Sequence, residues 1–552
     1  MPAMAGVFEN RCCPFQVSGS HQRIAADGVT LVVLEHQQPN VDAASLLRAY
    51  RNGGAQALHE RSADCTLVLF DVVAQQLVLS RDAVGVHPCY YRETPTKFAF
   101  ATFVADVIRA CGTSGPARSA LAARLVHGQS PAPGETYFND IHSVPPGCTL
   151  VIADGRASLL RSARPQLHPN GRFTFEDAAV EFARLFERAV RSRLDATSKT
   201  AVLVSGGLDS AAIISCTNPP DALGITYGLT DGSPADERQY VAALRARGHL
   251  IESVEFYPSS DIASVERSVQ SLEQPVADDV PATLERAAQA ARQAGAAVLM
   301  LGTWGDQVLS PFPPPYMRQV APWHFRAHQR AATAYQRYMT DLPQNEVLHV
   351  LLRASLRARI PQPLLRRMHA RRRSSVFDVL AREFTAPEPA SPPQTYGAAV
   401  HQAVTDAEHC AALEASTKWG LANGLEVRLP FLDVSLLNWL RTIPDDVAYH
   451  NFALKPLLRA GLRDKLPAEI VHRRDKGDYT QAIGSGKVPV LQVLDALDGL
   501  RRLVEFGLMS TASARVTLAK LSKASNIADN TKQLASNLLA VDAWLRQFFE
   551  AR

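Results

Sequence analysis

The sequence predicts a mixed α/β protein in two parts, a β-rich sandwich over residues 1–165 and a parallel sheet with a helical C-terminal region over residues 173–552. Three observations lead to this prediction. Short β-prone runs crowd the first part, and apolar strands alternate with helical stretches from Thr174 onward. Between the two, residues 162–172 carry two prolines and a glycine and are the best candidate for a linker.

The composition is that of an ordinary globular protein and excludes several other classes. With 46% apolar and 20% charged residues, the chain is neither disordered nor fibrous, and its 552 residues suffice for about three domains or two large ones. A net charge of +4 does not by itself indicate nucleic-acid binding, and no apolar run approaches the roughly 20 residues that cross a bilayer. Eight scattered cysteines form no CxxC pair, and no export signal is visible. We therefore expect a reduced, soluble, cytoplasmic protein with neither a nucleic-acid nor a membrane partner.

The strands of the first part are predicted from short runs of β-branched, aliphatic and aromatic residues. These runs are Val29–Leu34, Cys65–Phe70, Gln76–Ser80 and Phe98–Phe100. The second and third are separated by a short turn and so predict a hairpin. A later strand, Val144–Ile152, contains a Pro-Pro-Gly turn near its start.

In the second part the hydrophobic period changes to that of a helix. Thr174 and Asp177 form a capping pattern, and the apolar residues that follow fall on one helical face. Strands and helices then alternate, which favours a parallel sheet covered on both faces. The predicted strands and intervening helices are Thr200–Val204, a helix from Leu208, Gly224–Leu229, Ala235–Arg247, Ala282–Ala294 and Ala296–Leu301.

Residues 320–480 and the end of the chain predict mostly helix. Within them, Arg353–Arg373 carries eight arginines among leucines. This segment has two readings: a solvated amphipathic helix whose arginine stems cover apolar surface, or a docking face for an acidic peptide.

The most informative segment is the string LVSGGLDS at residues 203–210. It follows an apolar strand and opens a helix, a context in which backbone N–H groups and a helix N-terminus hold an anion. Gly206 and Gly207 let the backbone approach phosphates closely. Asp209 would repel a phosphate unless a divalent cation such as Mg²⁺ lay between them. The alternative is a generic glycine-rich turn before a helix.

This string is the pyrophosphate-loop signature of the ATP pyrophosphatase superfamily, and the chain resembles the asparagine synthetase family in particular. Three further segments match that family in order: LGTWGD at 301–306, GLEVRLPFLD at 424–433, and 455–477 with its Lys-Pro-Leu-Leu-Arg start and Arg-Arg-Asp-Lys-Gly end. The resemblance implies an adenine-nucleotide α-hydrolase-like parallel sheet, with ATP and Mg²⁺ as cofactors.

The resemblance also implies roles for individual residues. Lys476 would contact the α-phosphate as a catalytic group, with a surface lysine as the alternative, and Arg428 and Asp433 would hold the architecture together. Thr303-Trp304 and Gln307 depart from the family's second loop, which weakens the case for free aspartate as substrate. The remaining implied residues are Ser205, Gly206, Gly207, Asp209 and Ser210 for pyrophosphate, Asp209 and Asp306 for the metal, and Leu203, Tyr227 and Gly302 for adenine.

The first part resembles the glutamine amidotransferase domain that precedes the synthetase domain in this family, a sandwich of the N-terminal-nucleophile type. The matching stretches are residues 77–91, 98–101 and 144–147. Glutaminases of this type use an N-terminal Cys whose own amine serves as base. Residue 2 is Pro, and Cys12 and Cys13 are internal. We therefore expect a degenerate, catalytically dead scaffold.

A domain that adenylates a carboxylate without ammonia from glutamine needs another amine. Within the family this departure resembles the β-lactam synthetases and the lasso-peptide cyclases, and the Arg-rich helical insert favours the cyclases. The expected function is ATP-dependent macrolactam formation in a precursor peptide, with a leader-peptide protease and a leader-binding protein as further partners. Glu414, counted back from the Pro-Phe-Leu-Asp stretch, coincides with a catalytic Glu of the β-lactam synthetases and is the candidate general base, with a surface glutamate as the alternative. The other candidate functions are a small-molecule amide ligase, of the asparagine or β-lactam synthetase kind, and a degenerate nucleotide-binding scaffold.

Overall fold

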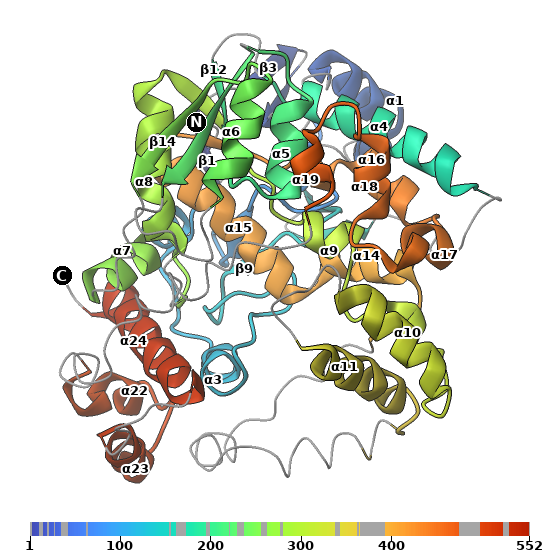
Figure 1. The fold of residues 1–552 in the computed structure, drawn as a ribbon. Coiled ribbons are helices and arrows are strands. Elements are labelled where there is room, and N and C mark those ends of the chain that lie inside the picture. Colours follow the sequence, from blue (N-terminus) through green and yellow to red (C-terminus); the bar gives the residue numbers. More distant parts are fainter. Residues whose placement is uncertain are drawn as a thin grey trace.

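The fold is described here from a computed structural model (Figure 1). None of the described helices combines the length and the apolar character that crossing a bilayer requires. The described residues are 3–9, 15–18, 21–26, 28–34, 42–61, 65–153, 156–161, 173–194, 199–219, 221–228, 237–255, 262–276, 280–336, 343–361, 364, 392–473, 497–522 and 529–550.

Two antiparallel sheets form the N-terminal part. The first has the strand order β2-β1-β8-β7-β9 and the second the order β11-β10-β6-β5-β4-β3. The first comprises β1 (Ala3–Glu9), β2 (Phe15–Ser18), β7 (Tyr90–Glu93), β8 (Lys97–Ala101) and β9 (His142–Ser143). The second comprises β3 (His21–Ala26), β4 (Val29–Leu34), β5 (Thr66–Asp71), β6 (Gln76–Ser80), β10 (Cys148–Ala153) and β11 (Arg156–Arg161).

The two sheets pack face to face, with helices on their outer faces. Along β5, Val68 points inward and shares one apolar cluster with Phe100 of the other sheet. Its neighbour Leu67 points outward and packs with Leu46 of α1 (Ala43–Arg61). Because successive side chains of a strand alternate between faces, a strand covered on both sides is apolar throughout, which explains the continuous β-prone run in the sequence.

The C-terminal helices return to the N-terminal part. The described helices there are α22 (Arg501–Glu505), α23 (Thr511–Ser522) and α24 (Asp529–Phe549). Trp544 of α24 packs on Phe138 with ring centroids 4.8 Å apart, and the surrounding cluster joins these helices to the first sheet through α2 (Val104–Cys111) and α3 (Arg118–His127). Figure 1 shows α24 beside α7 and α3.

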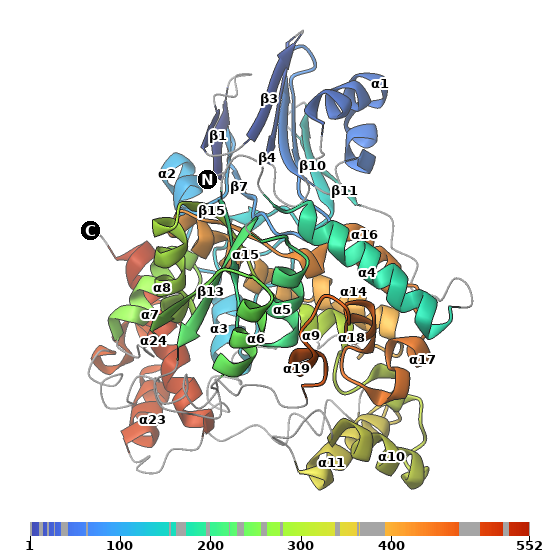
Figure 2. The same ribbon diagram turned by 45° about the horizontal axis from the view of Figure 1, so that its top comes forward.

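A five-stranded parallel sheet forms the centre of the second part. Its strand order is β14-β13-β12-β15-β16, and every described pair is parallel. Figure 2 shows the antiparallel sheets and α1 at the top, above this sheet and its helices. The strands are β12 (Lys199–Leu203), β13 (Ala222–Gly228), β14 (Ile251–Glu255), β15 (Ala296–Met300) and β16 (Glu426–Arg428). Helix α4 (Phe175–Arg191) precedes β12. The helices between the strands are α5 (Leu208–Ser215), α6 (Arg238–Ala246), α7 (Ile262–Leu272) and α8 (Val280–Gln293).

The remaining described helices follow β15 and complete the second part. At the start of α4, the Thr174 side chain accepts a hydrogen bond from the Asp177 N–H, as the capping pattern predicts. The later helices are α9 (Gly305–Leu309), α10 (Phe325–Gln336), α11 (Gln344–Arg357), α14 (Tyr396–Thr405), α15 (Ala407–Ala422), α16 (Val434–Leu440), α17 (Asp445–Ala448), α18 (Pro456–Gly461) and α19 (Ala468–Val471).

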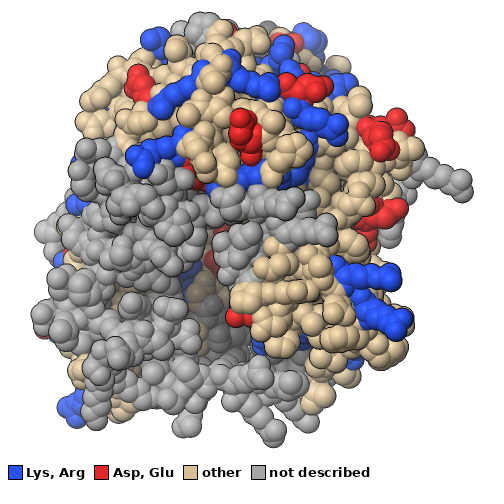
Figure 3. Space-filling model, viewed as in Figure 1, with Lys and Arg blue, Asp and Glu red and all other residues tan. Residues whose placement is uncertain are grey.

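The Arg-rich segment lies only partly within the described residues. Arg353, Arg357 and Arg359 are exposed, while Leu351 and Ala354 are buried on the other side of the same helical stretch. Figure 3 shows Lys and Arg side chains of this face as separate groups, one of them at the α10–α11 edge. The described part fits a solvated amphipathic helix.

Several elements differ from the sequence-based expectation, among them β1, β14, a long helix of the first part and an edge strand of the second. The first part contains the long helix α1, which the β-rich reading omitted, and the motif at 424–433 contributes the edge strand β16. Helix α1 is only weakly amphipathic, and Gly53 and Gly54 break its helical geometry, so its period is not evident in the sequence. The candidate linker 162–172 lies outside the described residues, so the domain boundaries stay a prediction.

Candidate active site

The order of the parallel strands creates a crevice at the carboxyl edge of the sheet. From β12 the chain adds β13 and β14 on one side, and then β15 and β16 on the other. At such a reversal the loops after neighbouring strands diverge and leave room for a ligand. A cavity of about 800 Å³ is lined by the residues that follow β12 and β15, a volume typical of small-molecule sites.

The loop after β12 is shaped by one glycine. Gly206 has a φ of +74°, and a Cβ there would lie 3.0 Å from the Glu237 Cβ, so the position requires glycine on both counts. The Ser205 N–H donates to the Ser210 Oγ at 3.1 Å, which ties the loop to the first turn of α5. The loop therefore presents backbone N–H groups and a helix N-terminus at the cavity wall.

Lys455 joins the two carboxylates that the sequence predicts as metal ligands. Its Nζ lies 2.5 Å from Asp209 Oδ2 and 2.6 Å from Asp306 Oδ1. Burial alone would lower the pKa of Lys455, but the two carboxylates outweigh this effect and raise it above its usual value, so the side chain is an ammonium. The Lys455 N–H donates to Ser310 Oγ at 2.6 Å, which fixes the residue at the start of α18.

The second nucleotide loop presses against the first at two glycines. A Cβ on Gly305 would lie 2.4 Å from the Asp209 Cγ, and one on Gly302 would lie 3.0 Å from the Ser210 backbone nitrogen. A side chain at position 305 would therefore displace the Asp209 carboxylate, and one at position 302 would require the first turn of α5 to shift by a few tenths of an ångström. This contact holds Asp209 and Asp306 on the same wall.

Arg473 stabilises the loop that follows β12. Its Nη1 donates to the Gly206 carbonyl at 3.0 Å and to Glu237 Oε1 at 2.6 Å, and its guanidinium lies 4.0 Å from the centroid of the Tyr240 ring. The hydrogen bond to the carbonyl, the ion pair and the cation–π contact together fix the Arg473 guanidinium. This residue also lines the cavity.

The chemistry of the donor set fits ATP with Mg²⁺. This ion takes hard oxygen ligands and is commonly held by one or two carboxylates together with substrate phosphates. Asp209 and Asp306 supply two such carboxylates, and the described residues contain no group of three His, Cys, Asp or Glu that would cage an ion by itself. The cavity therefore suits an ion shared with phosphate oxygens.

Most of the predicted nucleotide residues come together in this cavity. The predicted residues that line it are Leu203, Ser205, Gly207, Asp209, Ser210, Gly302 and Asp306. Gly206 shapes the same loop. Tyr227 is half-buried in β13 but is not among the lining residues, which does not favour its expected contact with adenine. Lys476 lies outside the described residues.

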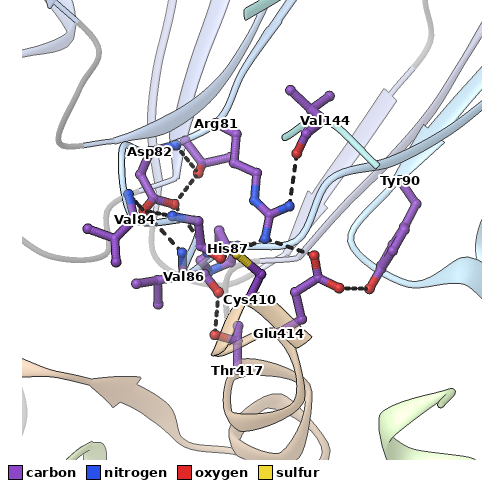
Figure 4. Close-up of polar contacts among 12 residues, drawn as sticks. Arg81, Asp82, Val84, Val86, His87, Tyr90, Val144, Cys410, Glu414 and Thr417 are labelled. Carbon is purple, nitrogen blue, oxygen red and sulfur yellow. Dashed lines mark hydrogen bonds and ion pairs between the residues drawn. The ribbon is translucent and has the colours of Figure 1, made fainter. Parts of the chain in front are cut away.

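The expected role of Glu414 needs correction. This residue lies on α15, but its carboxylate bonds to Arg81 Nη2 at 2.9 Å and to the Tyr90 hydroxyl at 2.5 Å (Figure 4). The cavity is lined by the opposite face of α15. An acid held by an arginine and a tyrosine on the far side of the helix is not placed to accept a proton from a substrate in this cavity.

Arg428 and Asp433 behave as architectural residues. Arg193 Nη1 pairs with Asp433 Oδ2 at 3.0 Å, both side chains being buried, and the Asp433 side chain also caps α16. Arg428 pairs with Glu426 at 2.7 Å and donates to the Arg193 carbonyl. Neither residue lines the cavity.

Two functional candidates, Lys455 and Arg473, carried no assigned role in the sequence analysis. Both lie inside the matched stretch at 455–477, and this was the only signal that could have found them. The wall of α15 adds the titratable side chains Glu408 and His409, next to Arg124 of the N-terminal part.

Replacing Asp209 or Asp306 by Asn should remove a metal carboxylate without unfolding the chain. We expect AMP formation to fall by about a hundredfold or more, because the amide lacks the negative charge that would hold Mg²⁺ at the phosphates. The near-wild-type shape of the amide keeps the contact with Lys455. Circular dichroism should be unchanged, and full activity in either variant would refute the metal assignment.

The comparisons with known proteins agree on one family. The profile described as asparagine synthase matches residues 181–546, and the profile described as glutamine amidotransferase domain matches residues 33–162. The chain is 20% identical over 460 residues to asparagine synthetase (glutamine-hydrolyzing) 3 of Bacillus subtilis strain 168, covering 78% of this chain and 70% of that protein. It is 27% identical over 187 residues to amidase chry2 of Gibberella zeae, covering 32% and 26% respectively.

Solved structures also match, and one of them is similar at a level that does not bear on the fold. It is the glutamine phosphoribosylpyrophosphate amidotransferase of B. subtilis, complexed with ADP and GMP. The match covers 56% of this chain and 76% of that one, at 11% identity and a TM-score of 0.18.

Proposed function

This chain belongs to the asparagine synthase family, and on that premise we propose that it closes a macrolactam within a ribosomal precursor peptide. Membership makes it an ATP-dependent, amide-forming carbon–nitrogen ligase. The proposal concerns the substrates: the acid is an Asp or Glu side chain of the peptide, and the amine is the N-terminus of the same peptide. This is the chemistry of lasso-peptide biosynthesis.

The reaction has two balanced steps. In the first, the side-chain carboxylate attacks the α-phosphorus of ATP, a new phosphorus–oxygen bond forms, and the bond to the β-phosphate breaks with release of pyrophosphate. In the second, the N-terminal amine attacks the acyl carbon, the amide bond forms, AMP leaves, and one proton passes to a base. Holding both ends of one peptide together supplies much of the rate through proximity.

The residues of the chain divide this work. The backbone of the loop at 203–210 binds the pyrophosphate, and the Lys455 ammonium offsets the negative charge gathered between Asp209 and Asp306. Asp209 and Asp306 would hold Mg²⁺, which would supply positive charge to the phosphates. Lys476 is proposed to stabilise charge at the α-phosphate.

The general base is proposed to come from the first turn of α15. Asp209 and Asp306 bind Lys455, and Glu237 binds Arg473. The other side chains of the cavity wall that can accept a proton at neutral pH are Glu408 and His409. The Glu408 carboxylate accepts from Ser130 and lies 3.7 Å from Arg124, so both parts of the chain meet at this end of the cavity.

One observation carries the proposal: a complete pyrophosphate loop is combined with an N-terminal part in which residue 2 is Pro and the first cysteines are internal. A glutaminase of this type needs a Cys with a free α-amine. We propose that the N-terminal part of this chain delivers no ammonia from glutamine and that the peptide itself supplies the amine. Cys12 and Cys13 lie outside the described residues. A leader-peptide protease and a leader-binding protein are proposed as partners, and the cytoplasm as the location.

A small-molecule amide ligase is the second candidate. It is favoured by the relative named asparagine synthetase, which matches across 78% of the chain. Thr303, Trp304 and Gln307 line the cavity at the second loop, where the sequence departs from the family pattern. This departure favours an acyl substrate other than free aspartate.

The amine source separates the candidates. With ATP, Mg²⁺ and free aspartate, neither ammonia nor glutamine should yield appreciable asparagine, because on this proposal the cavity takes a peptide carboxylate and the N-terminal part hydrolyses no glutamine. The chain should release no glutamate from glutamine, and the double variant Cys12→Ala/Cys13→Ala should form product at the wild-type rate. Glutamate release by the wild type that is lost in this variant would restore the glutaminase, and efficient asparagine synthesis would favour the second candidate.

A further inference from the structure

The loop that follows β6 is folded around one aspartate. Asp82 Oδ1 accepts the backbone N–H groups of Val84, Gly85 and Val86, at 3.2, 2.7 and 3.0 Å, and its Oδ2 accepts the His87 N–H at 3.2 Å (Figure 4). Four backbone donors on one buried carboxylate give this loop a single shape. The loop belongs to the stretch at 77–91, which matches the amidotransferase domain. If this domain hydrolyses no glutamine, the stretch has no catalytic role there.

This loop inserts into the core of the ligase half. Val84 and Val86 are 4% and 1% exposed and belong to the apolar cluster built around the parallel sheet, not to the cores of their own sheets. The Thr417 hydroxyl of α15 donates to the Val86 carbonyl at 2.6 Å. The N-terminal part therefore contacts α15 through a rigid loop that is buried on both sides.

A buried ion pair fixes α15 at the same interface. Arg81 Nη2 lies 2.9 Å from Glu414 Oε1, and the two side chains are 1% and 12% exposed. Arg81 is itself held by the carbonyls of Val144 and Gly85, at 2.8 and 2.6 Å. Burial, reinforced by Glu414, raises the pKa of Tyr90 well above its usual value, so its hydroxyl stays protonated and donates to the second Glu414 oxygen.

A second buried pair lies one turn along the helix. Lys418 Nζ is 2.8 Å from Glu273 Oε2 and 4.3 Å from the centroid of the Tyr90 ring. The same Glu273 carboxylate accepts the backbone N–H groups of Val104 and Ala105, at 2.7 and 2.8 Å, and so caps α2 of the N-terminal part. Glu414 and Lys418 are four residues apart and therefore face the same way.

The opposite face of α15 is the wall of the cavity. Its lining residues are Glu408, His409, Ala411, Ala412, Ala415, Ser416 and Trp419. Because Ala411, Ala412, Ala415 and Ser416 have short side chains, the position of the middle of this wall depends on the backbone of α15. A displacement of the helix would thus change the space for the substrate directly.

We propose that Arg81 is a positioning residue for the ligase reaction, which acts through Glu414 to fix the rotation of α15 and thereby the acyl-substrate wall of the cavity. The N-terminal part is then an active-site support that has lost its own chemistry. This inference rests on the proposed function for the identity of the carboxylate substrate, and on geometry alone for the position of the helix.

Stability and positioning can be separated by removing the ion pair in two ways. Arg81→Met alone leaves the Glu414 carboxylate buried without its arginine and should lower the thermal midpoint. The double variant Arg81→Met/Glu414→Leu replaces both charges by apolar groups and should recover most of that loss, because such replacements are often neutral. It lacks the directional contact of Arg81 with Glu414, so the rotation of α15 is less tightly fixed, although the contacts of Thr417 and Lys418 remain.

The measurement is ATP–pyrophosphate exchange by the full-length variants. The concentrations of ATP and of the peptide that carries the Asp or Glu side chain are varied in turn. In the double variant the KM for the carboxylate should rise about tenfold while the KM for ATP stays unchanged, because a small misplacement of a positioning group is costly. A merely structural loss would reduce the amount of active enzyme and leave both KM values alone. Glu414→Gln, whose amide oxygen can still accept from Arg81, should keep a near-wild-type KM.

A control elsewhere in the chain is the pair Arg502–Asp542, at 3.1 Å between α22 and α24, in which Asp542 is buried and Arg502 also pairs with Glu550. Arg502→Met/Asp542→Leu should leave both KM values unchanged. Hydrogen exchange of the α15 amides gives a reading that needs no substrate, and protection should fall in Arg81→Met but not in the control. An unchanged carboxylate KM in the thermally restored double variant would overturn the proposal.

Failure of the wild type to exchange pyrophosphate with any carboxylate would count against the proposed function and not against the positioning of the helix. Hydrogen exchange then decides the second question by itself. Unchanged α15 protection in Arg81→Met would overturn the role of Arg81.

Discussion

Replacing Lys455 by Met should reduce adenylation by about a hundredfold to a thousandfold, the loss typical when one preorganised donor is removed from a charge-stabilising site. Lys455 is the only cation among the described residues whose ammonium contacts both Asp209 and Asp306. Without it, negative charge accumulates where a triphosphate has to bind. The rate of AMP formation at saturating ATP measures the effect.

Lys465→Met is the matched control for this prediction. Lys465 follows the same short helix but pairs at the surface with Glu187 at 3.3 Å, and its side chain is 36% exposed. Its replacement should leave the rate unchanged. Mg²⁺ should raise the thermal midpoint of Lys455→Met more than that of the wild type, because the cation compensates for the lost ammonium. Wild-type adenylation in Lys455→Met would refute the assignment.

Replacing Gly305 by Ala should cost about a hundredfold in adenylation, since a misplacement near 1 Å has effects of that size. The added methyl would lie 2.4, 2.6 and 2.7 Å from the Asp209 Cγ, Oδ1 and Oδ2. The carboxylate has to move, and its bond to Lys455 is then broken. Steady-state AMP formation measures the loss, while far-ultraviolet circular dichroism should remain that of the wild type.

Gly128→Ala provides the comparison for a glycine without a neighbour. Gly128 has a φ of +66°, and nothing lies within 4 Å of the added methyl. The strained backbone should destabilise the fold by about 1 kcal/mol without a change in rate. Equal rate losses in the two variants would show that the effect of Gly305→Ala is a general loss of stability.

The main strands could be predicted because buried strands are short, continuous runs of apolar residues in the sequence. The runs at 76–80 and 29–34 are strands with those bounds, and Thr174 caps α4 as its spacing with Asp177 predicts. Helix α1 could not be predicted, because it is only weakly amphipathic and its helical geometry is broken at Gly53 and Gly54. Its position depends on tertiary packing against the outer face of β5.

The candidate site could be predicted only where it is continuous in sequence. The glycine-rich loop was found from its own string, whereas the contact between Lys455 and Asp209 joins residues 246 positions apart. Glu414 shows the limit of counting along a helix, since each residue turns by about 100° and a gap of one residue changes the face. The neighbouring Ala415 lines the cavity, while Glu414 reaches the N-terminal part.

The central claim is that one peptide supplies both the acid and the amine, and mass spectrometry of a single linear peptide tests it most directly. The peptide carries a free N-terminal amine and an Asp or Glu several residues later, and is incubated with the full chain, ATP and Mg²⁺. The account predicts AMP and a product lighter than the peptide by one water. Acetylation of the N-terminus should abolish this mass loss and still permit acyl-AMP formation, because the first step does not use the amine. An unchanged peptide mass, together with efficient amide formation from free aspartate and ammonia, would contradict the account.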